Sequence, residues 1–166
     1  MSELDILVAE IQKNMEVAGK IRGFLEATED SELPKKGKTP ASALMMAGIL
    51  DNYYTCLETL FLRISQHFEN HLEESRWHQA VLEKMTIRIP GVREALLRDE
   101  TRQSLLELLR FRHFKRYYFE FEYDWKRIDY LVSVLKDVHP MVAEDVQRFV
   151  AWLEEARSGA RKESPG

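Results

Sequence analysis

The chain has 166 residues, enough for one domain with a substantial hydrophobic core and too few for two comfortable ones. Hydrophobic residues make up 45% of it and charged residues 31%, and only 7 glycines argue against an all-β chain with many turns. A net charge of -4 excludes a protein that binds nucleic acid through its overall field, so any such binding must be local.

The N-terminal residues and the cysteine content bear on the cellular compartment. Residues 1–5, Met-Ser-Glu-Leu-Asp, are acidic where a secretory signal would be basic, and no segment approaches about 18 consecutive apolar residues. Cys56 is the only cysteine, which excludes an intrachain disulfide and a cysteine-based zinc site and suits a reduced core thiol. We therefore expect a cytoplasmic protein with no membrane partner.

A long amphipathic helix is expected at the N-terminus, where Ser2 and Asp5 form a capping pair. Apolar residues then recur at steps of three and four, as a buried helix face requires: Leu4, Val8, Ile11, Met15, Ala18, Ile21 and Leu25. The segment Glu29–Lys38 turns polar and contains Pro34 and Gly37, so the sequence predicts a loop there.

The next helix is expected to be the central one. Thr39 suits its N-cap and Pro40 its first helical position. One apolar stripe runs along it: Met46, Leu50, Tyr53, Leu57, Leu60, Ile64 and Phe68. Further apolar residues widen the arc, as a helix surrounded by neighbours requires.

Two shorter helical segments follow. The first covers about Trp77 to Met85 and is interrupted by Ile89-Pro90-Gly91. Asp99 or Thr101 can cap the second, which we expect to lose regularity between Tyr117 and Tyr123.

The last helix is predicted to begin after Asp124 and to run past Pro140, because its apolar stripe continues unbroken on both sides of that proline. Residues 158–166 are small, charged and proline-terminated, which predicts a disordered tail after a single domain over residues 1–157. The fold class expected from these segments is all-α, an up-and-down bundle of four to five helices.

The concentrated chemical signal is the basic and aromatic stretch from Arg110 to Trp125. Four cations and no acid lie between Glu107 and Glu120. Aromatic residues alternate with these cations. The cations are Arg110, Arg112, Lys115 and Arg116. Cations can bind phosphate and rings can stack on bases, whereas a purely structural interpretation assigns the rings to the core and the cations to the negative end of the helix dipole.

The spacing of this stretch favours a functional interpretation. Leu105, Leu109, Arg112 and Arg116 follow helical steps, so an apolar stripe runs directly into two guanidinium groups. Such a face needs a cleft, an acidic partner or an anion at that point.

Elsewhere, His67 and His71 lie four residues apart and could share a helix face as metal ligands. Their acidic and amide neighbours indicate a solvated helix end instead, and we expect neither a metal nor a cofactor.

At these residues the chain resembles the HEPN superfamily of small helical bundles, and more closely the HepT-like toxins found beside a minimal nucleotidyltransferase. The family motif is an arginine, four to six residues, a histidine, and then x-Tyr. Four further segments carry the resemblance: Leu50-Asp-Asn-Tyr-Tyr, Trp77-His78, Ile89-Pro-Gly-Val-Arg93 and Phe121-Glu-Tyr-Asp-Trp125. The resemblance implies a two-fold homodimer and a metal-independent ribonuclease whose shared cleft joins the motif residues of both subunits. It also implies a nucleotidyltransferase antitoxin as partner.

The carried-over motif departs from the family at one position. Its arginine falls on Arg112, and four intervening residues lead to Tyr117, where the family has histidine; no register supplies that histidine. The x-Tyr becomes Tyr118-Phe119, so the hydroxyl that family partners modify with AMP is absent at its own position, with Tyr117 and Tyr118 as alternatives.

Two functions from different classes follow. In the enzyme hypothesis His113 is the general acid or base, since an imidazole with an unperturbed pKa of about 6.5 suits this task better than tyrosine at about 10. Tyr117 orients it or donates a proton, Arg112 clamps the scissile phosphate, and Arg110, Arg116 and Tyr118 bind RNA. In the alternative, a catalytically degenerate bundle binds RNA, a nucleotide or a nucleotidyltransferase partner without cleavage, and a third possibility is a purely structural oligomer.

Overall fold

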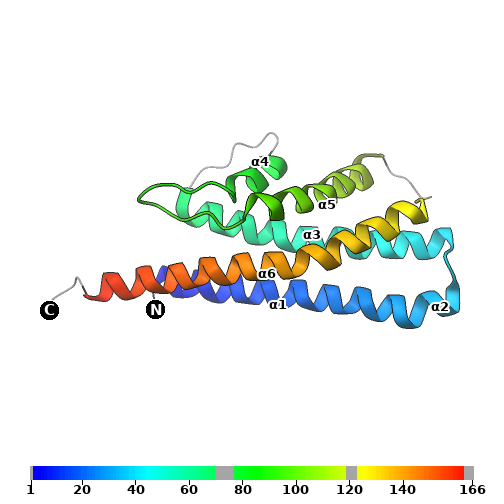
Figure 1. The fold of residues 1–166 in the computed structure, drawn as a ribbon, viewed down its shortest axis with the longest axis horizontal. Coiled ribbons are helices and arrows are strands. Elements are labelled where there is room, and N and C mark those ends of the chain that lie inside the picture. Colours follow the sequence, from blue (N-terminus) through cyan, green and yellow to red (C-terminus); the bar gives the residue numbers. More distant parts are fainter. Residues whose placement is uncertain (1, 70–76, 119–122, 163–166) are drawn as a thin grey trace.

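Four long helices lie side by side in the computed structural model, which describes residues 2–69, 77–118 and 123–162. They are α1 (Glu3–Ala27), α3 (Pro40–Glu69), α5 (Asp99–Tyr118) and α6 (Trp125–Lys162). Successive long helices run in opposite directions, and the shorter α4 (Trp77–Lys84) lies beside α3 and α5 (Figure 1). The expected all-α, up-and-down bundle is confirmed for the described residues.

Three of the predicted helix starts are confirmed by their capping hydrogen bonds. At α1 the Ser2 hydroxyl accepts from the Asp5 amide while the Asp5 carboxylate accepts from the Ser2 amide. At α3 the Thr39 hydroxyl accepts from the amide of Ser42 at 3.1 Å. At α6 the Asp124 carboxylate accepts from the Lys126 amide at 3.0 Å.

The loop predicted for Glu29–Lys38 is wrong over most of its length. The chain continues from α1 into a π-helical turn, η1 (Thr28–Glu32), and then into α2 (Leu33–Lys36). Pro34 lies in the first turn of α2, a position at which helices tolerate proline. The helical segment ends only at Gly37, whose φ of 74° is in the left-handed region that favours glycine.

The start of α5 also differs from expectation, because neither Asp99 nor Thr101 precedes the helix as a cap. Asp99 is already helical, and the buried Thr101 donates its hydroxyl to Asp145 of α6 at 2.6 Å. The same carboxylate accepts from the Arg98 amide at 3.1 Å. A fully buried acid from the neighbouring helix therefore anchors the start of α5.

One continuous helix, α6, passes through Pro140, as the unbroken stripe predicted. It extends to Lys162, so the first residues of the segment predicted as a disordered tail are helical. Residues 163–166 lie outside the described part of the chain.

The core is centred on α3, which packs against α1, α4, α5 and α6. The stripe predicted for this helix is buried at Met46, Leu50, Tyr53, Leu57, Leu60 and Ile64. None of the described helices has both the length and the apolar character needed to cross a membrane. Because α3 is buried on nearly all sides, its polar residues have to find partners within the protein.

Candidate functional site

Two carboxylates of α3 face α5 from the middle of the bundle. Asp51 and Glu58 are seven residues apart and so lie on the same side of the helix, two turns from each other. Glu58 is 3% exposed and has the buried aromatic residues Tyr54 and Phe61 one turn to either side. A carboxylate in such surroundings requires a cationic partner.

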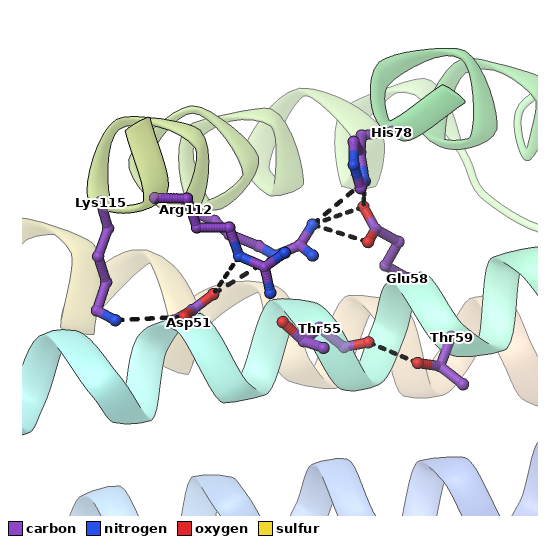
Figure 2. Close-up of polar contacts among 8 residues, drawn as sticks. Asp51, Thr55, Glu58, Thr59, His78, Arg112 and Lys115 are labelled. Atoms are coloured by element: carbon purple, nitrogen blue, oxygen red, sulfur yellow. Dashed lines mark hydrogen bonds and ion pairs between the residues drawn. The ribbon is translucent and has the colours of Figure 1, made fainter. Parts of the chain in front are cut away.

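Arg112 of α5 is that partner. Its Nη1 donates to both carboxylate oxygens of Glu58, at 2.7 and 2.8 Å, and its Nε lies 3.4 Å from Oδ1 of Asp51 (Figure 2). The arginine is 5% exposed, which places a charge-assisted pair between two helices in the protein interior. The acidic partner that the stripe of α5 requires is therefore supplied by the chain itself.

His78 of α4 joins the same carboxylate. Its Nδ1 lies 2.8 Å from Oε2 of Glu58, and Figure 2 shows the ring above Glu58, beside the end of the Arg112 side chain. Three elements that are distant in sequence thus meet at Glu58: α3 supplies the acid, α4 an imidazole and α5 a guanidinium.

Asp51 is shared by further cations at the C-terminal end of α5. Lys115 Nζ lies 3.4 Å from its Oδ2, and Arg116 Nε lies 3.9 Å from its Oδ1. Together with Arg112, three cations therefore share two carboxylates. The side chain of Arg116 is 48% exposed, so its guanidinium is within reach of a ligand from solvent.

Tyr54 completes the buried part of the cluster. Its ring lies under Arg112, with the guanidinium carbon 5.8 Å from the ring centroid. Burial raises the pKa of the Tyr54 hydroxyl, Glu58 raises it further, and Arg112 opposes the increase. The hydroxyl therefore remains protonated and does not supply a base.

A pocket of about 150 Å³ opens where this cluster reaches the surface between α4 and α5. Its lining consists of His78, Leu109, Arg112, His113 and Arg116. Two imidazoles and two guanidiniums around one small pocket are groups suited to an anion and to proton transfer.

The structure brings three of the predicted site residues together, Arg112, His113 and Arg116, since all three line this pocket. Arg110 is not in its lining; its side chain is exposed and pairs with Glu107 at 3.1 Å. Tyr117 and Tyr118 form the last turn of α5, and their side chains lie outside what the structure describes.

The histidine pair considered as a metal site receives no support. His71 lies outside the described residues, and the His67 ring packs edge-on against Phe68. No group of three or more potential metal-binding side chains occurs within residues 2–69, 77–118 and 123–162.

Sequence reasoning missed four members of the cluster, Asp51, Tyr54, Glu58 and His78. A signal for Glu58 was present, because an acid with apolar residues three and four positions away lies on a buried helix face. Its partner Arg112 is 54 residues further along the chain, and no local pattern connects the two.

Comparison with known proteins supports the resemblance noted from the sequence. Residues 45–153 match a protein family described as HepT-like protein. No curated protein and no solved structure gives a match. The matched region spans α3 to α6 and includes every residue of the pocket.

Proposed function

The chain belongs to the HepT-like family, and from this premise we propose that it is a metal-independent RNA endonuclease that acts as the toxin of a toxin–antitoxin pair. The observation that carries the proposal is the pocket in which the His113 imidazole lies with the guanidiniums of Arg112 and Arg116. Cleavage of RNA without metal needs these two kinds of group: an imidazole to move protons and cations to stabilise the charge that develops on phosphorus.

The two arginines take different roles in this proposal. Arg112 forms ion pairs with Glu58 and Asp51 and is 5% exposed, so it contributes positive charge to the wall of the pocket. Arg116 is held more loosely and is 48% exposed, so it is the arginine that contacts the scissile phosphate. The sequence-based assignment of the phosphate clamp to Arg112 is thereby modified, while Arg116 keeps its predicted role in binding.

The size of the pocket limits what it can hold. About 150 Å³ is small beside the roughly 300–1,000 Å³ of ordinary ligand pockets. It suits one phosphate group, and the nucleotides on either side must lie across the surface. We propose that a second copy of the chain completes this surface as a cleft and that a nucleotidyltransferase is the antitoxin partner, as the resemblance implies.

The test is incubation of the purified protein with single-stranded RNA in excess EDTA. We expect products with 2′,3′-cyclic phosphate and 5′-hydroxyl ends, and no cleavage where the attacking 2′-hydroxyl is replaced by hydrogen. Arg116→Gln should weaken RNA binding and turnover, whereas Arg88→Gln, at an exposed arginine outside the pocket, should not. Uncut RNA under all conditions would contradict the proposal.

A second candidate function, binding of RNA or a partner without cleavage, is favoured by the hydrogen bonds between Arg112 and Glu58. Since both oxygens of Glu58 accept from its Nη1, the arginine has a structural role in the absence of any substrate. A bundle that binds RNA or a partner without cleaving it would need Arg112 only for this structural role. In that case RNA should be retained at low salt and released intact, and retention should fall in Arg116→Gln.

A further inference from the structure

We infer that His78 is the second catalytic imidazole of this site, a general base that is held in place by Glu58 and works opposite His113. The inference rests on the proposed ribonuclease function and adds to it the group that the sequence motif lacks. It is carried by the convergence of α3, α4 and α5 on one carboxylate at the edge of the pocket.

The hydrogen bonds around Glu58 determine which nitrogen of His78 is basic. Both oxygens of Glu58 accept hydrogen bonds from Arg112, at 2.7 and 2.8 Å, so the carboxylate acts as an acceptor on each oxygen. The proton between Glu58 and His78 therefore belongs to Nδ1 of the imidazole, 2.8 Å away. In this tautomer of the neutral ring, Nε2 is the nitrogen that carries the lone pair.

The shorter of the two contacts at Nδ1 decides the tautomer, because Glu58 lies 2.8 Å from this nitrogen and Arg112 only 3.5 Å. Arg112 Nη1 can only donate and lies at the outer limit of hydrogen-bond distance from Nδ1, whereas its bonds to the two Glu58 oxygens are 2.7 and 2.8 Å long. Glu58 thus fixes the ring orientation and tautomer and stabilises the imidazolium that forms when Nε2 takes a proton. A buried acid has this same effect on the imidazole of a hydrolase triad.

The position of His78 allows it to act on a bound phosphate. Its side chain is 35% exposed and lines the same pocket as His113 and Arg116. His78 comes from α4 and His113 from α5, so the two imidazoles line the pocket from different helices. Two imidazoles beside one phosphate can divide the two proton transfers that the reaction needs.

The reaction then balances without a co-reactant. Nε2 of His78 removes the proton of the 2′-hydroxyl, and the 2′-oxygen forms a bond to phosphorus. The bond from phosphorus to the 5′-oxygen breaks, and that oxygen takes a proton from the imidazolium of His113. The products are a 2′,3′-cyclic phosphate and a 5′-hydroxyl, with Arg116 and Arg112 facing the charge on the phosphoryl oxygens.

The test uses His78→Asn, because an asparagine amide can replace Nδ1 as donor to Glu58 while no basic nitrogen remains. We expect kcat for RNA cleavage in EDTA to fall by about 100-fold, within the range for loss of a general base, with KM changed less than about twofold. In the profile of kcat against pH the acidic limb should disappear, since that limb reports protonation of the base, and the alkaline limb should remain. His67→Asn, on α3 and outside the pocket, is the control with wild-type turnover.

Each outcome separates this inference from the proposed function. A folded His78→Asn protein with wild-type kcat and both limbs of the pH profile overturns the role of His78 and leaves the ribonuclease function intact. Wild-type protein that cuts no RNA overturns the function itself. If His78→Asn does not fold, His78→Gln, which places its amide nearer the Nε2 position, is measured in the same way and must show the same loss.

Discussion

His113→Gln is expected to lower kcat for RNA cleavage by about 10² to 10⁴-fold, the usual cost of losing a general acid. His113 lines the pocket from the exposed face of α5, so its replacement removes the proton donor for the 5′-oxygen without disturbing the core. The unfolding free energy should change by no more than about 0.5 kcal/mol, as for other surface substitutions. The measurements are single-turnover cleavage in EDTA and urea unfolding of the same preparation.

The matched control for this variant is His67→Gln. His67 lies on α3 near the N-terminal half of α1, away from the pocket, and should tolerate the change with full turnover. Equal cleavage rates for His113→Gln and wild type would remove His113 from the mechanism.

Arg112→Met is expected to destabilise the fold by about 3–5 kcal/mol, because it leaves the Glu58 carboxylate buried without its guanidinium. Glu58 is 3% exposed, so water cannot replace the two hydrogen bonds that are lost. A loss of this size is a large part of the roughly 5–15 kcal/mol that stabilises a typical domain. Urea unfolding at neutral pH measures it.

Two comparisons separate the loss of this buried cation from a general effect of losing an arginine on α5. Arg110→Met removes a cation whose side chain is 64% exposed and should change stability by less than about 1 kcal/mol. The double variant Arg112→Met with Glu58→Leu removes both charges and should recover most of the loss, since replacing a buried ion pair by apolar groups is often close to neutral. An Arg112→Met protein as stable as Arg110→Met would contradict the buried network.

Much of the fold could be predicted from the sequence because it depends on local patterns. Ser2, Thr39 and Asp124 mark helix starts by their own side chains, and the stripes of α1, α3 and α6 follow from helical periodicity. The errors arose where partners are distant. Asp145 anchors the start of α5 through Thr101, which lies 44 residues earlier in the chain, and no short motif predicts that contact.

Pro34 shows a different kind of error, since the prediction treated it as a helix breaker. Proline is compatible with the first turn of a helix, and the π-helical turn before it lets the chain continue without a break. The polar composition of the segment then reflects an exposed helix end rather than a loop.

The candidate site was only partly predictable for the same reason. Arg112, His113 and Arg116 were singled out because cations and rings are concentrated in one stretch of sequence, and they do line one pocket. That stretch contains no acid between Glu107 and Glu120, yet Asp51 and Glu58 neutralise much of its charge in the folded protein. His78 became a candidate only when the fold placed it on Glu58.

The central claim is that the pocket between α4 and α5 receives an RNA phosphate. The most direct test is a titration of histidine-labelled protein with an uncleavable 2′-deoxy dinucleotide, in which NMR monitors the imidazole signals. We predict that the signals of His78 and His113 shift together with one dissociation constant, whereas those of His67 and the half-buried His139 stay unchanged. Unchanged signals from His78 and His113 at saturating ligand would contradict the claim.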